Sequence, residues 1–171
     1  MPLAFTVRAA RPTDAAGVDR LLERSYGTLL APDYEPELLA RALPRMNRSN
    51  PKLLACPTWY LAEIQGGEHD GRIGGCGGWT PDRPGTGERE PGLGHVRHFG
   101  TDPDLTGHGI ARALLERTIA DAQEAGFDRL ECFSTITAEP FYARFGFRTV
   151  ERVEVAMGPD VSLPSVLMIR P

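Results

Sequence analysis

The chain has 171 residues, a net charge of −4 at pH 7 and 41% hydrophobic residues. This length fits one domain over residues 1–171 that buries its core without disulfides, and three widely spaced cysteines exclude a disulfide framework or a zinc cage. No basic cluster marks a nucleic-acid partner, no apolar run nears the roughly 20 residues of a membrane span, and the N-terminus lacks a secretory pattern. We therefore expect a cytoplasmic protein with no nucleic acid, membrane or metal partner.

The first part of the chain predicts a short strand and two helices. Residues 5–8 form the strand, and Thr13 is placed to cap the first helix. Residues 37–43 favour a second helix that Pro44 limits or kinks. The first helix is expected to bury one face, namely Val18, Leu21, Leu22 and Ser25.

The middle of the chain predicts a β-hairpin followed by a surface loop. Residues 59–64 and 72–79 are the two strands, with a glycine-rich turn between them. Glycines are unfavourable in strands, so the four in the second strand indicate a bulge or a close approach by another backbone. Trp79 either lines a pocket or fills the core, and residues 80–92 form the loop.

A third pattern combines a strand, a glycine-containing loop and a long helix. Alternating residues from 93 to 99 form the strand, which Asp102-Pro103 ends. The loop Thr-Gly-His-Gly at 106–109 leads into a helix with an apolar stripe, which Gly126 ends. The first N–H groups of a helix have no internal partner and lie at the positive end of its dipole. The loop therefore predicts an anion site, with a phosphate or pyrophosphate as the ligand.

The C-terminal part predicts a strand at 127–134, a short helix at 138–145 and two more strands at 147–155 and 165–169. The last strand is apolar. It either pairs across the interface of a homodimer or completes the sheet.

Two of these segments resemble motifs of the GCN5-related N-acetyltransferases, the GNAT family. The loop and helix that begin at Thr106 resemble its acetyl-CoA-binding motif, and Phe141-Tyr142 followed by Gly146-Phe147 resembles its Phe-Tyr-x-x-x-Gly-Phe signature. The element order agrees over nearly the whole chain. The resemblance implies an α/β GNAT fold, with a mixed central sheet of about seven strands splayed at the cofactor site and about four flanking helices.

The resemblance also implies that acetyl-CoA is the co-substrate and indicates where it lies. Phe99 and Thr101 would bond its pantetheine arm through their main chain, and one of their N–H groups would stabilise the oxyanion. Thr106 stands where Gln or Arg is usual, which removes a side-chain contact but leaves the backbone donors. The pyrophosphate would be held by Thr106, Gly107, His108, Gly109, Ile110 and Ala111.

Tyr142 and His95 are the expected catalytic residues. The resemblance implies that the Tyr142 hydroxyl protonates the departing CoA thiolate, and a phenol with a pKa near 10 holds its proton at neutral pH. His95 stands where many members have a glutamate that takes the amine proton, and its pKa near 6.5 suits a base or relay. Glu131 and Glu63 are alternatives for that base.

The sequence thus favours an N-acetyltransferase in which an amine of a small molecule or peptide attacks acetyl-CoA directly. An acidic chain suits a cationic amine, but a charge of −4 is too small to identify the acceptor. Tyr26 and Tyr34 either contact that acceptor or simply pack. The alternative is a non-catalytic acyl-CoA-binding regulatory module of the same fold, favoured by Thr106 and by the missing strand glutamate.

Overall fold

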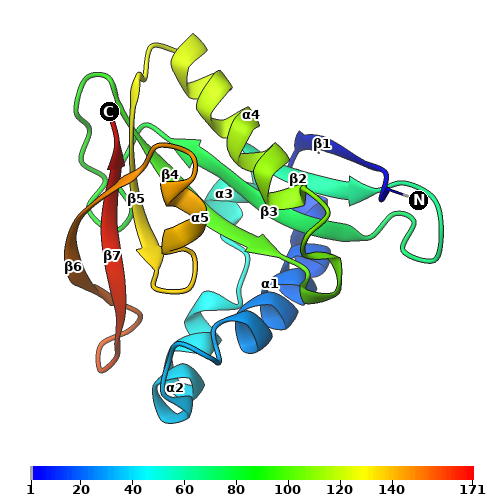
Figure 1. Cartoon of the computed structure of the whole chain (residues 1–171), viewed down its shortest axis with the longest axis horizontal. Helices are drawn as coiled ribbons and strands as arrows, with labels where there is room; N and C mark the ends of the chain where they lie inside the picture. The colour runs from blue at the N-terminus through cyan, green and yellow to red at the C-terminus, as the bar shows by residue number, and fades with distance from the viewer. Residues whose placement is uncertain (1) are drawn as a thin grey trace.

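A mixed sheet of seven strands forms the centre of the computed structural model, which describes residues 2–171 (Figure 1). The strands are β1 (Phe5–Ala9), β2 (Trp59–Ile64), β3 (Ile73–Thr80), β4 (Leu93–Thr101), β5 (Arg129–Thr135), β6 (Arg148–Ala156) and β7 (Ser162–Arg170). Their order in the sheet is β1-β2-β3-β4-β5-β7-β6. Only β4 and β5 run parallel as neighbours, because the other pairs are antiparallel. The expected α/β architecture with a mixed sheet of about seven strands is confirmed.

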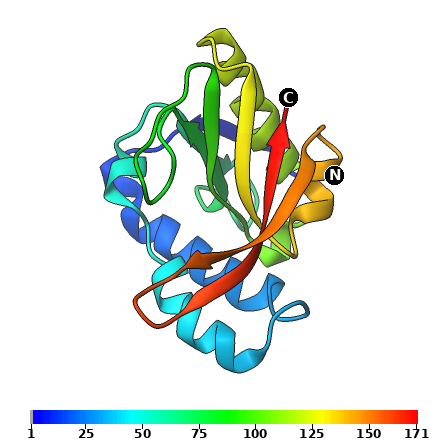
Figure 2. The same ribbon diagram turned by 90° about the vertical axis from the view of Figure 1, so that its left-hand side faces the viewer.

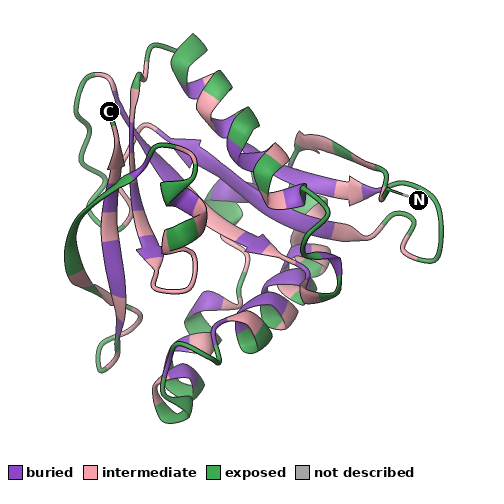
Figure 3. Ribbon diagram, in the orientation of Figure 1, coloured by how far each residue is buried: buried purple, intermediate pink, exposed green. Residues whose placement is uncertain are grey.

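Helices cover both faces of the sheet and create two hydrophobic cores. The helices are α1 (Ala15–Leu29), α2 (Pro36–Met46), α3 (Pro51–Leu54), α4 (Ile110–Glu124) and α5 (Glu139–Ala143). Alternate residues of β2 point to opposite faces, so Trp59 and Leu61 join the core under α1 to α3, whereas Tyr60 and Ala62 join the core under α4 and α5. Figure 3 shows the resulting buried stripes on the sheet and on α4. Within residues 2–171, no helix is both long and apolar enough to cross a membrane.

The glycines of β3 allow α4 to pack closely against the sheet. A Cβ atom added to Gly75 would lie only 2.5 Å from the Ile110 Cγ2 atom of α4. The pairing of β3 with β4 shifts register between Cys76 and Gly78, and Gly77 there has a φ of 157°. The expected bulge is thus present, and so is the expected close approach by another backbone: a Cβ atom added to Gly78 would lie only 2.5 Å from the Trp59 Cα atom of β2.

Three details differ from the sequence-based expectations. Thr13 lies in a 3₁₀ turn and Asp14 is the N-cap of α1, because the turn of Pro12–Asp14 precedes the helix. A fifth helix, α3, follows Asn50, whose side chain accepts a hydrogen bond from the Lys52 N–H at 2.9 Å. Asn50 and Pro51 are residues that favour the N-cap and the first position of a helix.

The third difference concerns the C-terminal strand. β7 lies between β5 and β6, so both of its edges are already paired and it cannot pair across an interface. The strand at that edge of the sheet is β6, whose side chains are mostly exposed. Figure 2 shows β6 and β7 at this end of the molecule. The homodimer stays a prediction, and a pairing between sheets would involve an edge strand, β6 or β1.

Two central strands diverge, and this divergence positions the candidate site. β4 and β5 pair only over Leu93–His95 and Arg129–Glu131. Beyond these residues β4 continues beside β3, whereas β5 continues beside β7. The sheet therefore opens between β4 and β5, as the expected splay requires.

Candidate active site

The opening between β4 and β5 leads into a cavity of about 670 Å³. Its walls come from the diverging parts of the two strands, residues 96–101 and 132–135, and from helices on both faces. Ala111 of α4 lies at one end, and Arg45 of α2 and Asn50 before α3 lie on the other face. The cavity is thus lined from both faces of the sheet, at the opening between β4 and β5.

The loop before α4 has the backbone that an anion site needs. Gly107 and Gly109 have φ angles of 79° and 82°, in the left-handed region that glycine adopts without strain. Residues 106–109 are exposed, so the free N–H groups at the start of α4 face solvent. The Ile110 side chain is instead buried in the core. Of residues 106–111, only Ala111 lines the cavity. Their role in binding pyrophosphate stays a prediction.

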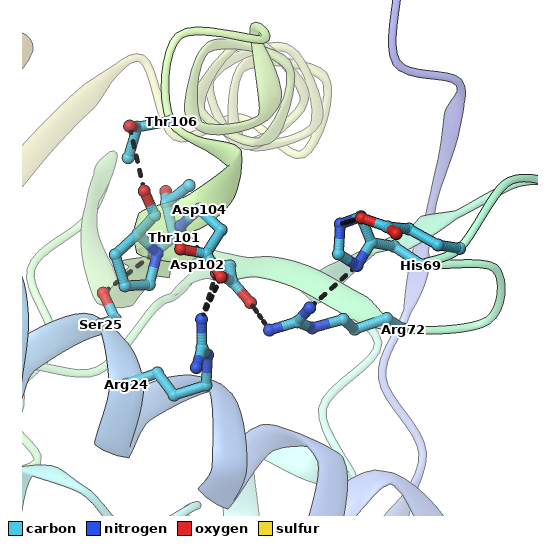
Figure 4. A network of polar contacts seen from close by, with 10 residues as sticks. Arg24, Ser25, His69, Arg72, Thr101, Asp102, Asp104 and Thr106 are labelled. Atoms are coloured by element: carbon cyan, nitrogen blue, oxygen red, sulfur yellow. Dashed lines mark hydrogen bonds and ion pairs between the residues drawn. The ribbon is translucent and has the colours of Figure 1, made fainter.

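Asp102 fixes the entrance to this loop through a set of charged contacts (Figure 4). Its carboxylate is 1% exposed, lies 2.7 Å from the Arg72 guanidinium and 3.3 Å from that of Arg24, and accepts the Asp104 N–H at 2.9 Å. Burial alone would raise the pKa of Asp102, but these hydrogen bonds and positive charges outweigh it and lower the pKa. Asp102 is therefore ionised at neutral pH and holds the chain between β4 and the glycine loop.

Two expected main-chain contacts for the cofactor already have partners in the protein. The Phe99 carbonyl oxygen accepts the Tyr26 hydroxyl at 2.7 Å, and the Thr101 N–H donates to the Ser25 hydroxyl at 3.2 Å. Both residues line the cavity, and their contact with the cofactor stays a prediction. A carbonyl oxygen has a second lone pair, so Phe99 can still accept a bond from pantetheine. The Thr101 N–H already donates to Ser25 of α1. It can therefore bind pantetheine or stabilise the oxyanion only if this hydrogen bond breaks.

A bulge in β4 brings these groups to the cavity wall. His98 has a φ of 53°, which is rare for a residue other than glycine. Its ring is buried against Tyr26, with centroids 5.9 Å apart, and its Nε2 lies 3.1 Å from the Met46 carbonyl oxygen. Burial lowers the pKa of His98, so the ring is neutral at physiological pH. The expectation that His98 is structural agrees with these contacts.

Tyr142 lines the cavity from α5 and is held by aromatic neighbours. Its ring packs edge-on against Phe99, Phe141 and Phe147, at centroid distances of 6.1, 5.2 and 5.4 Å. Burial raises the pKa of Tyr142 well above its usual value, and the neighbouring Cys132 adds to this effect. The hydroxyl therefore keeps its proton over the whole physiological range.

His95 does not share this cavity with Tyr142. It lines a smaller pocket of about 250 Å³ under the 80–92 loop, where its Nδ1 lies 3.5 Å from Glu131 Oε1. That carboxylate also lies 3.1 Å from Arg83 Nε. Burial lowers the pKa of His95, although Glu131 opposes the effect, so the ring is neutral at pH 7. His95 and Tyr142 thus line different pockets, because β4 has not yet parted from β5 at residue 95, and the catalytic role of His95 stays a prediction.

The other candidates are divided between the cavity and the core. Tyr26 lines the cavity, whereas Tyr34 bonds the Pro164 carbonyl oxygen and lies outside it. Trp79 is 3% exposed and packs on Phe127, so it fills the core. Arg97, which lines the cavity, was missed as a functional residue. Its position two residues after His95, on the same face of the strand, was the available signal.

Comparison with known proteins agrees with this geometry. The family described as "Acetyltransferase (GNAT) domain" matches residues 68–160. The Amino-acid acetyltransferase of Mycobacterium tuberculosis is 30% identical over 153 residues, which cover 87% of this chain and 71% of that protein. Among the described residues, no group of three or more His, Cys, Asp and Glu side chains is arranged to hold a metal ion.

Solved structures show the same fold. A GCN5-related N-acetyltransferase from Rhodopseudomonas palustris superposes with a TM-score of 0.78 at 19% identity, over 99% of this chain and 97% of that one. The PaiA N-acetyltransferase from Thermoplasma acidophilum, solved with coenzyme A, gives 0.68 at 13% identity, over 98% of each chain. From the family match and the mycobacterial relative together, the chain belongs to the GNAT family of acetyltransferases.

Proposed function

We propose that this protein is an N-acetyltransferase that moves the acetyl group of acetyl-CoA to an amine of a small molecule or peptide. The observation that carries the proposal is the cavity through the splayed sheet, which has Tyr142 in its wall and Ala111, beside the left-handed glycine loop, at one end. The name of the mycobacterial relative supports a small amine, and the coenzyme A in the PaiA structure supports the donor.

The residues present fit acetyl-CoA. The exposed N–H groups at the start of α4 suit a pyrophosphate, and the opening between β4 and β5 offers strand backbone to the amide groups of pantetheine. Acetyl-CoA supplies the activated thioester. The chain supplies the positioning, because a bound amine and thioester held in one cavity react as an intramolecular pair.

The cavity favours direct attack by the amine over transfer through an enzyme thiol. Cys132 is the only cysteine that lines the cavity within residues 2–171, and burial raises the pKa of its thiol to about 12. Its thiolate is therefore scarce at pH 7, and the thiolate is the nucleophilic form of cysteine. An acetyl-cysteine intermediate is thus unfavourable.

Tyr142 is the proposed proton donor to the leaving thiolate. Its pKa is raised, which by itself weakens it as an acid. The same burial raises the pKa of the Cys132 thiol, so a CoA thiolate formed beside it would also be strongly basic. Donor and acceptor are shifted in the same direction, and the Tyr142 hydroxyl remains able to donate its proton as the C–S bond breaks.

The amine must also lose a proton before or during attack, and His95 is the candidate group to accept it. His95 lies in the smaller pocket, so it would act only through a relay of water molecules past the 80–92 loop. A variant His95→Gln tests the relay. If His95 takes part, turnover falls and the acidic limb of the pH–rate profile disappears while acetyl-CoA affinity is unchanged. Unchanged turnover and pH profile would remove His95 from the mechanism.

The function is tested by release of CoA thiol from acetyl-CoA across a panel of amines, with affinity for acetyl-CoA measured by calorimetry. We expect Tyr142→Phe to lower kcat by about 100-fold, the lower range for a lost general acid, at unchanged affinity. Tyr60→Phe is a matched control, because it removes a hydroxyl that bonds Asp121 outside the cavity. Tight binding of CoA without turnover on any amine would favour the regulatory module, and absence of CoA binding would refute both functions.

A further inference from the structure

Few charged residues line the main cavity, and they differ in sign and in exposure to solvent. Among the cavity-lining residues of the described chain, the arginine, lysine, aspartate and glutamate side chains are only Arg45, Arg97 and Glu154. Arg45 and Glu154 are exposed, whereas Arg97 is partly buried. The cavity thus has a net positive charge, although the chain as a whole has a charge of −4.

Arg97 is held in place but is not paired with an anion. Its Nη1 donates to the Thr80 hydroxyl at 3.0 Å, and that hydroxyl in turn donates to the Asp82 carbonyl oxygen at 2.9 Å. No ion pair joins Arg97 to a carboxylate in residues 2–171, whereas Arg8, Arg24 and Arg72 each have one. Burial lowers the pKa of the Arg97 guanidinium, although the negative charge of Asp82 opposes the effect without forming an ion pair with it.

A partly buried guanidinium without an anionic partner is costly, because transfer out of water penalises the charged form. Four of its five N–H donors remain after the bond to Thr80. Guanidinium groups match the planar geometry of a carboxylate and bind it through two parallel hydrogen bonds. A ligand carboxylate in the cavity would therefore complete the coordination of Arg97.

We propose that the acceptor is an amine that carries a carboxylate, as an amino acid does, and that Arg97 binds this carboxylate while the amine faces the thioester. The proposal rests on the function proposed above and specifies its acceptor. Arg45 adds a second positive charge at the same cavity. A polyamine lacks any anion to offer these two arginines, and the amino end of a peptide has its first carboxyl group tied up as an amide.

The test compares acceptors with and without the carboxylate, and kcat/KM is expressed per neutral amine because amidation also lowers the pKa of the α-amine. CoA release is measured with a set of L-amino acids and with the carboxamide of each one, using wild type, Arg97→Met, Arg97→Lys and the control Arg20→Met. Arg20 is exposed on α1, forms no ion pair in the described chain and lies outside the cavity. Melting temperatures identify any variant that fails to fold.

For wild type and Arg20→Met we expect kcat/KM to favour the carboxylate form by about 10- to 100-fold, as one charge-assisted pair predicts. Arg97→Met should lose this preference, mainly through KM, at unchanged acetyl-CoA affinity. Arg97→Lys should retain part of the preference for the carboxylate, because lysine keeps the positive charge but lacks the two parallel N–H donors of a guanidinium. Equal turnover of amino acids and amides by wild type would overturn the carboxylate proposal and leave the transferase function standing.

A binding arm keeps the proposal testable without turnover. N-acetylalanine and N-acetylalaninamide are titrated into the CoA-loaded protein, and the Nε–H resonance of the Arg97 side chain is followed by NMR. A shift with the carboxylate probe alone supports the carboxylate site even if no amine is acetylated, in which case only the transferase function fails. Equal response to both probes, or none to either, would overturn the site.

Discussion

Replacement of Asp102 by asparagine tests the contacts that hold the chain between β4 and the glycine loop. Asparagine preserves the shape and can still accept the Asp104 N–H with its amide oxygen. It removes the negative charge that faces Arg24 and Arg72. The amide NH₂ group would then point a donor at a guanidinium that also only donates.

The size of the effect follows from the two ion pairs. The contact with Arg72 is short, at 2.7 Å, and its side chain is 26% exposed, so it counts as a charge-assisted bond of about 1.5–3 kcal/mol. The contact with Arg24 is long and exposed, and Arg24 retains Asp104 at 2.6 Å, so its loss adds little. We expect Asp102→Asn to cost about 2 kcal/mol, which corresponds to roughly 4–8 °C in Tm at this chain length.

The assay is thermal unfolding followed by circular dichroism as a function of pH. The lowered pKa of Asp102 means that its stabilisation is complete above its ordinary pKa of 3.8 and is lost as the pH falls through the lower pKa of the folded state. The gap between wild type and Asp102→Asn should therefore be constant from pH 5 to neutrality and close in stronger acid. Asp104→Asn, at an exposed carboxylate, is the matched control and should change Tm little.

An unchanged Tm for Asp102→Asn at pH 7 would refute the reasoning. A gap that persists in strong acid would also contradict it, because the protonated carboxyl no longer differs in charge from the amide. The same variant should weaken acetyl-CoA binding, since Asp102 positions the residues that lead to α4. Calorimetry with acetyl-CoA checks this second effect, and Asp104→Asn again serves as the reference.

Three further predictions concern glycines. Gly109→Val should weaken acetyl-CoA binding in calorimetry, because a φ of 82° strains a β-branched residue, and unchanged affinity would contradict the loop's role. Gly75→Ala should destabilise the fold by about 1–3 kcal/mol in urea unfolding, since its methyl group would overlap the Ile110 side chain. Gly27→Ala in the last turn of α1 should instead stabilise by up to about 1 kcal/mol, because nothing lies within 4 Å of the new methyl group; a loss of stability would show that the helix argument fails there.

The sequence predicted most helices, strands and turns well, because the residues of each segment themselves determine its backbone conformation. The loop before α4 needs left-handed backbone at Gly107 and Gly109, and only glycine supplies this cheaply, so the sequence shows it directly. The buried face of α1 follows from its apolar spacing, and all four residues expected there are buried. Helix α3 was missed because a single turn has too few residues for periodicity to appear.

The division of the site could not be predicted, because it depends on where two strands separate. His95 and Arg97 lie on the same face of β4 by alternation, yet His95 precedes the splay and Arg97 follows it. The bulge at His98 and the engagement of Phe99 by Tyr26 depend on contacts between residues over 70 positions apart. No local pattern contains such information.

Three consecutive residues of α1 are joined to the strand that would carry the donor. Arg24 contacts Asp102, Ser25 accepts from Thr101, and Tyr26 donates to Phe99. These contacts thus join α1 to β4 and to the residue that follows it, along one turn of the helix. To change the acceptor, residues 24–26 should therefore be kept and the cavity-lining positions of α2, of the residues before and in α3, and of the 80–92 loop should be varied. Substitutions at those positions leave the contacts between residues 24–26 and β4 unchanged.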